Sequence, residues 1–240
     1  MSIRAVRKFG FICPGRRTAG EKKVKNMIVL YEDGDLIVCV KPAGALSEKD
    51  EKKANMVTMI AEHTGAEPYP VHRLDKDTGG VTVYAKTARA AAALSKQLQN
   101  GGFKKRYLAA AEGTPEQKSG EMQDLLFRDK RLNKTFVVDR VRAGVKTAKL
   151  SYTVRDEKNG FFLADILLLT GRTHQIRAQF SSRKHPLYGD RKYGGRAGDL
   201  ALFAYSLSFT HPFTGKKLEF EYLPDFNIPP WNMFCYKKEE

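Results

Sequence analysis

The chain is poor in cysteine and has no long apolar run. Its 240 residues include three cysteines, and none of them forms a CxxC pair. This usage argues against a disulfide framework and a cysteine zinc site, and it favours a reducing compartment such as the cytoplasm. No stretch approaches the ~18 consecutive apolar residues of a membrane helix, so we expect no membrane segment. The basic N-terminus lacks the apolar core of a secretory signal, so none is expected.

Motifs for nucleotide or metal chemistry are also missing from the sequence. There is no GxGxxG, no GxxxxGK[ST] and no internal repeat. His63, His72 and His174 lack the compact spacing of a metal site. We therefore expect neither a cofactor nor a metal.

Positive charge is what the chain has in excess. It carries 42 Lys+Arg against 27 Asp+Glu, a formal net charge of +15. Such a charge fits a polyanionic partner, namely nucleic acid, an anionic membrane or an acidic protein, although a merely basic surface is the alternative. The bases gather in residues 1–26 (eight bases, one acid), 86–106 (six bases, no acid) and 172–196 (seven bases, one acid).

Short apolar runs separated by turns predict a sheet-rich fold. We expect a hairpin over residues 27–40, and further strands at 81–85, 103–111, 146–155, 161–169, 200–209 and 216–222. Helices are expected at 87–99, with Thr87 as N-cap, and at 173–182. This pattern predicts an α+β fold with a mainly antiparallel or mixed sheet and peripheral helices. We expect one domain over residues 27–240, preceded by a flexible basic arm over residues 1–26.

Three polar clusters lie at the ends of predicted strands, over residues 71–80, 104–107 and 170–177. Asp75 follows Arg73 closely, and a carboxylate near a guanidinium stays ionised, as a nucleophile requires. A turn-capping aspartate is the commoner interpretation of such a residue. Taken singly, Tyr107 is also explained as a strand tyrosine, and Arg172 as a surface cation.

Taken in order, however, the motifs point to one family. They are His72-Arg73-Leu74-Asp75, Thr78-Gly79-Gly80, Ala85-Lys86, Arg106-Tyr107-Leu108-Ala109, Gly171-Arg172-Thr173-His174-Gln175-Ile176-Arg177, His185-Pro186-Leu187-Tyr188-Gly189-Asp190 and Tyr193-Gly194, preceded by Tyr31-Glu32-Asp33 and Lys41-Pro42-Ala43-Gly44. This ordered set, over residues 27 to 225, closely resembles the RluA-type family of RNA pseudouridine synthases. The basic N-terminal S4 domain of some relatives is not expected here, because 26 residues are too few to build it.

The resemblance implies an enzyme that isomerises uridine to pseudouridine in structured RNA. It implies that Asp75 is the essential carboxylate, that Tyr107 packs on the base and helps to remove the C5 proton, and that Arg172 pairs with the aspartate. Arg73 is expected to fill the space left by the extruded nucleotide. The further substrate-binding candidates are Leu74, Thr173, His174, Gln175, Arg177 and Leu202. The implied partner is ribosomal or transfer RNA, bound by a cytoplasmic monomer without cofactor, metal or membrane.

The sequence departs from the family pattern at Gly79, Gln179, Lys184 and Phe203. None of these departures replaces Asp75, Tyr107 or Arg172, so we expect catalysis to be kept. One alternative is an inactive RNA-binding protein, or RNA chaperone, on the same fold. Another is a hydrolase that uses Asp75 and Asp77 as paired carboxylates. The target RNA, and the choice between nucleophilic attack and elimination, stay open.

Overall fold

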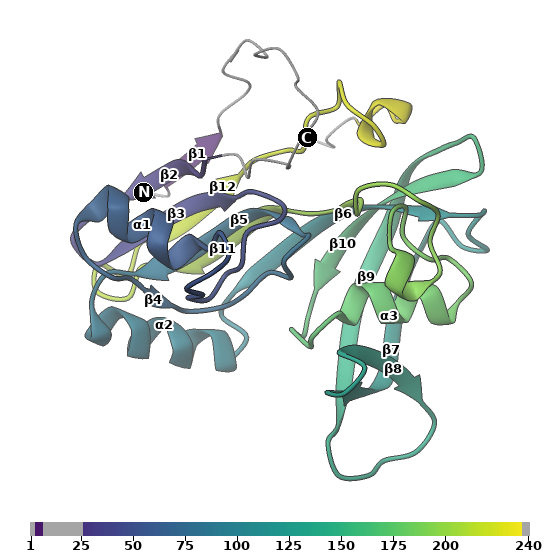
Figure 1. Ribbon diagram of the computed structural model, residues 1–240, viewed down its shortest axis with the longest axis horizontal. Helices are drawn as coiled ribbons and strands as arrows, with labels where there is room; N and C mark the ends of the chain where they lie inside the picture. The colour runs from purple at the N-terminus through teal and green to yellow at the C-terminus, as the bar shows by residue number, and fades with distance from the viewer. Residues whose placement is uncertain (1–2, 7–25, 237–240) are drawn as a thin grey trace. The chain divides into compact units, whose positions relative to one another are not determined.

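The computed structural model describes residues 3–6 and 26–236 (Figure 1). Its strands are β1 (Ile3–Val6), β2 (Ile28–Glu32), β3 (Leu36–Lys41), β4 (Tyr69–Pro70), β5 (Gly79–Ala85), β6 (Lys104–Glu112), β7 (Ser119–Asp129), β8 (Lys134–Val138), β9 (Val145–Lys158), β10 (Phe161–Leu168), β11 (Leu202–Thr210) and β12 (Lys217–Glu221). Its helices are α1 (Met56–Thr64), α2 (Ala88–Gln99) and α3 (Gln175–Ser182), with short 3₁₀ helices η1 (Arg191–Tyr193) and η2 (Trp231–Met233). Strands dominate, and the predicted α+β class is confirmed.

The chain divides into two compact units. Unit 1 comprises residues 1–102 and 206–222, and unit 2 comprises residues 103–205 and 223–240. Strand β11 therefore begins in unit 2 and ends in unit 1. The expectation of one domain over residues 27–240 stays a prediction.

Unit 1 is built on the predicted hairpin. Strands β2 and β3 pair antiparallel, and β3 also pairs with β5. The hairpin turn is closed by Asp33, whose Oδ1 accepts hydrogen bonds from the backbone N–H groups of Asp35 (2.8 Å) and Leu36 (2.9 Å). Both β3 and β5 are buried along their whole length, so they form the centre of the unit. The apolar cluster that joins α1 to these strands comprises Ile37, Cys39, Met56, Val57, Ile60 and Tyr84.

Helix α2 begins where the sequence predicts. The side chain of Thr87 accepts a hydrogen bond from the backbone N–H of Ala90 at 3.1 Å, which is the expected N-cap. The helix ends at Asn100, and Gly101 takes a left-handed conformation with φ +74°. Helix α3 begins two residues later than predicted, after His174. No helix in the described part of the chain is long and apolar enough to span a membrane.

Unit 2 is an antiparallel sheet in the order β6-β10-β9-β7-β8. On one face, Leu108 belongs to a core that includes Trp231 and Phe234 of the C-terminal segment. On the opposite face, Phe162 stacks on Phe180 of α3, with ring centroids 6.3 Å apart. Tyr107 is directly opposite Ile166 in the β6–β10 register. Because Ile166 and Phe162 are an even number of residues apart on β10, Tyr107 lies on the face that packs against α3.

The sequence did not predict α1, β4, β7 or β8. Strand β7 buries Met122 and Leu126, but the residue between them on that face is Asp124, so apolar residues do not alternate along its sequence. Helix α1 has nine residues, too few for a strong periodic signal, and depends on the Asn55 cap, whose side chain accepts from Thr58 N–H at 2.9 Å.

Part of the predicted basic arm belongs to unit 1. Residues Ile3–Val6 form β1, which pairs with β12 in parallel and makes the sheet mixed. These four residues are therefore part of the sheet and not of a loose arm. Residues 1–2 and 7–25 lie outside the described residues, and a flexible arm there stays a prediction.

Candidate active site

The loop that carries Asp75 precedes β5 in unit 1, and several bonds hold its backbone. The Thr78 N–H donates to the Asp75 carbonyl at 3.1 Å and closes a turn over residues 76 and 77. The Gly44 N–H donates to the Lys76 carbonyl at 2.8 Å. Asp75 itself is half-buried, whereas Lys76 and Asp77 are exposed. The fold thus fixes the backbone that carries the half-buried Asp75 carboxylate, as chemistry at a defined carbon requires.

Lys41, the last residue of β3, ties this turn to the interior of unit 1. It is 0% exposed, and its ammonium donates to the carbonyls of Pro42 (3.1 Å), Ala45 (2.6 Å) and Lys76 (3.0 Å). Burial lowers the pKa of Lys41 to about 8, against the attraction of the turn's carboxylates, Asp77 and Asp75. The three carbonyls match the three N–H donors of the ammonium, so its hydrogen-bonding capacity is fully taken up by contacts that hold the turn.

Ser47 supplies a second anchor for the same loop. Its Oγ donates to the Leu74 carbonyl at 2.9 Å and accepts from the Leu74 N–H at 3.0 Å. The Leu74 side chain is buried, which gives it a packing role, and its contact with substrate stays a prediction. Arg73 is exposed, and its Nη1 lies 3.0 Å from Glu48 Oε1. Because such a surface ion pair contributes little, this guanidinium is accessible to a ligand.

Tyr107 and Lys105 lie on β6 in unit 2. Tyr107 is buried, and Lys105, two residues earlier on the strand, shares its face of the sheet. The pKa of the Lys105 ammonium is lowered by burial and further by the charge of Arg172. A Cβ placed on Gly171 would lie 3.2 Å from Lys105 Nζ, so the loop after β10 passes close to this ammonium.

The loop that carries Arg172 is held by Gln175. This buried side chain accepts hydrogen bonds at Oε1 from Thr170 Oγ1 (2.7 Å) and from the Arg172 N–H (3.1 Å). Its Nε2 donates to the Lys149 carbonyl at 3.0 Å. The Arg172 side chain is exposed, and its Nε donates to the Thr147 carbonyl at 3.0 Å. Gln175 therefore positions Arg172, and direct binding of substrate by Gln175 stays a prediction.

The neighbouring candidates are engaged within unit 2. His174 has a left-handed backbone with φ +52°, and its Nδ1 lies 3.0 Å from Tyr193 Oη. Arg177 is buried, and it donates from Nε and Nη2 to Asp190, both at 2.7 Å. Thr173 is half-buried. These placements give His174 and Arg177 structural roles, and the substrate contacts of all three residues stay predictions.

Leu202 is the first residue of β11 and is buried in unit 2. A buried position suits the apolar side chain expected there, and its contact with substrate stays a prediction. The four departures from the family pattern are spread over the fold. They lie in β5 (Gly79), in α3 (Gln179), just after α3 (Lys184) and in β11 (Phe203). Gln179 is 0% exposed and donates to Asp124 Oδ2 at 2.6 Å, so its amide has a structural role in the packing of α3.

Three residues of the site had not been singled out for a role from the sequence, namely Lys41, Ser47 and Lys105. Lys41 had a detectable signal, because it is a cation at the end of an all-apolar strand and is followed directly by Pro42. Lys105 is two residues from Tyr107, and residues spaced by two share a face of a strand. Ser47 had no such signal, because its bonds to Leu74 span 27 positions of the chain.

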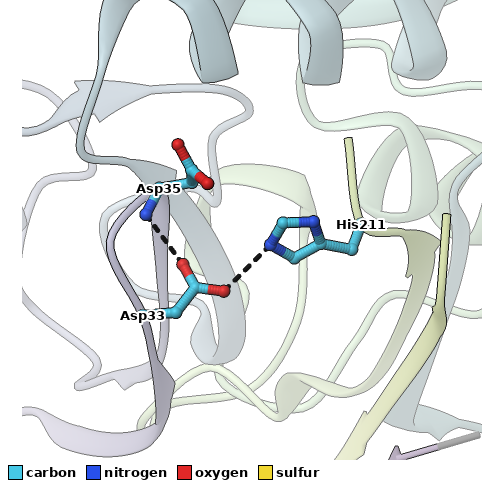
Figure 2. A group of neighbouring side chains, drawn as sticks. All are labelled: Asp33, Asp35 and His211. Atoms are coloured by element: carbon cyan, nitrogen blue, oxygen red, sulfur yellow. Dashed lines mark hydrogen bonds and ion pairs between the residues drawn. The ribbon is translucent and has the colours of Figure 1, made fainter. Parts of the chain in front are cut away.

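Among the described residues, one group of side chains has the spacing of a metal site. It comprises Asp33, Asp35 and His211 in unit 1, and Figure 2 shows the imidazole of His211 directed at the Asp33 carboxylate. His211 Nε2 lies 2.9 Å from Asp33 Oδ2, and Nδ1 accepts from the N–H groups of Phe213 (3.2 Å) and Thr214 (3.1 Å). Both ring nitrogens are thus occupied. The group joins two turns, and it makes a poor metal ligand.

The fold places this chain in a known class. It superposes on the structure of human RNA pseudouridylate synthase domain containing 1 with a TM-score of 0.72, at 21% identity over 88% of this chain and 89% of that one. It superposes on human RNA pseudouridylate synthase domain containing 4 with a TM-score of 0.69, at 22% identity over 83% and 89%. At such identities the likeness defines the fold, which is that of pseudouridine synthase catalytic domains.

The sequence comparison then gives the family. Residues 35–182 match the family model for RNA pseudouridylate synthase. The chain is 36% identical over 198 residues to the uncharacterized RNA pseudouridine synthase YhcT of Bacillus subtilis, covering 78% of this chain and 65% of that protein. It is 35% identical over 221 residues to ribosomal large subunit pseudouridine synthase D of Nitrosomonas europaea, covering 82% and 62%. The chain belongs to the RNA pseudouridylate synthase family, and the RluA-type resemblance is confirmed.

The match covers only part of the length of the relatives. The chain spans about two thirds of the length of the curated relatives it matches, 65% for the Bacillus subtilis protein. Asp75, Tyr107 and Arg172 all fall inside residues 35–182, the part that matches the family model.

Proposed function

We propose that this chain isomerises specific uridines in structured RNA to pseudouridine, with Asp75 as the essential carboxylate. The observation that carries the proposal is the turn that holds Asp75. It lies inside the region that matches the family model, and Lys41 and Ser47 fix its backbone. Tyr107 and Arg172, which the family resemblance also implicates, lie in the same matched region.

The proposed reaction is an isomerisation that needs no co-reactant. The bond from N1 of the uracil to C1′ of the ribose breaks, the base turns, and C5 bonds to the same C1′. The C5 position loses its proton and N1 gains one, so atoms and charge balance. Cleavage of a glycosidic bond develops positive charge at C1′, which an ionised Asp75 stabilises or attacks.

Two further residues have proposed roles in this reaction. Tyr107 packs on the base and helps to remove the C5 proton. Its burial in the sheet supports this, because a buried ring provides a rigid apolar surface for a base. Arg172 keeps the aspartate ionised, because a nearby guanidinium favours the charged carboxylate.

The substrate of this reaction has to be flipped out of the RNA, because a stacked uridine cannot reach a carboxylate. Arg73 precedes Asp75 by two residues and is exposed, which suits a side chain that fills the space left by the base. The net charge of +15 supports binding to the RNA backbone. A relative named for the ribosomal large subunit favours ribosomal RNA over transfer RNA. The cytoplasmic location, the monomeric state and the absence of a metal stay predictions.

The test is a map of pseudouridine in total RNA from cells with and without the gene. We expect at least one pseudouridine to disappear without the gene and to return when the unmodified gene is restored. Asp75→Asn is expected to lower pseudouridine formation more than about a thousandfold while RNA binding persists. An unchanged map would contradict the enzyme and favour the RNA-binding alternative.

Asp77→Asn is the matched control for this substitution. Asp77 lies on the same turn, carries the same charge and is exposed, so its loss should leave the pseudouridine map intact. If Asp77→Asn and Asp75→Asn fail alike, Asp75 has no special role, and the paired-carboxylate hydrolase returns as the alternative.

A further inference from the structure

Two cations of unit 2 lie near each other, and one of them, Lys105, shares a face of the sheet with Tyr107. Lys105 is on β6, and Arg172 is in the loop that follows β10. A Cβ on Gly171 would meet Lys105 Nζ at 3.2 Å. Arg172 lies near enough for its charge to lower the pKa of Lys105 beyond the effect of burial. The two charges thus repel each other at one spot.

No carboxylate of the described part of unit 2 forms an ion pair with either of these two side chains. Three arginines of unit 2 provide a contrast. Arg106 and Arg155 share the buried Asp165, at 2.8 Å and 3.0 Å from Oδ2, and Arg177 pairs with Asp190 at 2.7 Å. A half-buried ammonium next to a second cation costs free energy unless an anion offsets the charge. Within unit 2 the charge of this pair is therefore not offset, and a bound anionic ligand would offset it.

We propose that Lys105 and Arg172 together bind a backbone phosphate of the RNA strand, at the nucleotide presented to Tyr107. The proposal rests on the proposed function and deepens it. A phosphodiester has two free oxygens, so it can bridge an ammonium and a guanidinium at once.

The held position of Arg172 supports this assignment. Its Nε is occupied by the Thr147 carbonyl, and Gln175 fixes its backbone, so the two terminal nitrogens are presented from a defined place. These nitrogens are suited to bind a phosphate oxygen. A phosphate contact carries no base information, so the pair sets the affinity and register of the strand and leaves the choice of uridine to other residues.

The first experiment uses uridine monophosphate and uridine as probes, because both exist whatever the natural target is. Binding to the full chain is measured by chemical-shift titration, for 3′- and 5′-monophosphates separately. We expect at least one monophosphate to bind about tenfold more tightly than uridine. Lys105→Met should abolish this preference, and Lys104→Met should keep it, because Lys104 is the exposed neighbour on the other face. Equal affinity for nucleoside and monophosphate in the unmodified chain overturns the proposal.

A second measurement separates a ligand site from a structural lysine. If Lys105 is an unpaired cation reserved for phosphate, Lys105→Met should raise the urea midpoint of the RNA-free chain. A lysine with a structural partner would lower that midpoint when replaced, and such a result contradicts the site.

With an RNA stem-loop that carries a mapped uridine, the salt dependence of binding gives an independent readout. In an Asp75→Asn background, Lys105→Met should reduce the slope of log K against log salt by about 0.7 to 0.9, the value of one phosphate contact, and Lys105→Arg should restore it. An unchanged slope overturns the phosphate contact while leaving the isomerisation intact. Conversely, an unchanged pseudouridine map with a monophosphate preference would refute the function and keep the site.

Discussion

Two lysines, one in each unit, both have an ammonium group that is at least partly buried, but the partners of the two groups differ. Lys41 in unit 1 and Lys105 in unit 2 both have a pKa lowered by burial. The ammonium of Lys41 has three carbonyl acceptors, at 2.6 to 3.1 Å. Lys105 has no ion-pair partner in the described part of unit 2, and Arg172 adds a like charge beside it.

This difference distinguishes a lysine that stabilises the fold from a lysine that is proposed to bind a ligand. In unit 1 the Lys41 ammonium holds the turn that carries Asp75, so this cation has a structural role. In unit 2 the proposed role of the Lys105 ammonium is to bind a phosphate of the RNA. A buried cation without an anion is thus a better sign of a ligand site than a buried cation with a complete set of acceptors.

The largest effect in this comparison is expected at Asp165, whose carboxylate neutralises two arginines of unit 2. The carboxylate is 3% exposed and accepts from Arg106, Arg155 and, at 3.0 Å, from the hydroxyl of Tyr205. Asp165→Asn should lower the free energy of unfolding by about 3 kcal/mol, because it leaves two guanidiniums without their anion. Urea denaturation measures this effect. The exposed Asp139→Asn is the control, and a loss below about 1 kcal/mol for Asp165→Asn would contradict the network.

A smaller effect is expected at Lys41. Lys41→Met fills much the same volume but leaves three carbonyls without their donor, so the free energy of unfolding should fall by about 2 kcal/mol. Lys76→Met is the matched control, because Lys76 contributes its carbonyl to the same contact while its side chain is exposed. Urea denaturation of both variants checks the prediction. Equal stability of the two would show that the ammonium does not hold the turn.

The smallest expected effect is a change with pH in the free energy of unfolding that Lys41 contributes. The pKa of Lys41 falls from 10.5 to about 8 on folding, so between these values the unfolded chain binds more protons than the folded one. Stability from this group therefore rises as pH increases from 8 towards 10.5. The measurement is the difference in unfolding free energy between the unmodified chain and Lys41→Met at pH 7.5, 8.5 and 9.5, roughly the window that this pKa defines. This difference should grow with pH, and a constant difference would contradict the lowered pKa.

Tyr31 contributes a pH dependence of the opposite sign at higher pH. Burial, with help from Asp33, raises the pKa of Tyr31 from 10.0 to about 12. The unfolded chain then loses that proton first, so stability from Tyr31 falls as pH rises above 10. Because Tyr31 is present in both proteins, its effect cancels in the difference.

Much of the local structure was predictable from the sequence. The hairpin turn at Asp33, the N-cap at Thr87 and the strand that contains Tyr107 depend on residues close together in the chain, and all are confirmed. The family was predictable from the order of its motifs and is confirmed by the match over residues 35–182. The roles of Asp75, Tyr107 and Arg172 within that family stay predictions.

Other features were not predictable, for physical reasons. Strand β7 shows no apolar alternation in the sequence, because Asp124 lies between the buried Met122 and Leu126 on the same face. Leu74 and Gln175 lie in motifs that suggest contact with substrate, but the fold buries both side chains and gives them packing and positioning roles. Burial depends on which other parts of the chain pack over a residue, so it cannot be predicted from the motif that contains the residue.

The sequence by itself determined the charge of +15, the turns and caps, and the ordered motifs of the family, because these depend on composition or on short-range bonds. Only the tertiary structure decided which charges have partners. Lys41 meets the Lys76 carbonyl across 35 positions, and Arg106 meets Asp165 across 59. Such contacts follow from loop closure and strand register, which set distances that spacing along the chain does not contain. The unmatched charge at Lys105 is therefore visible only in the fold.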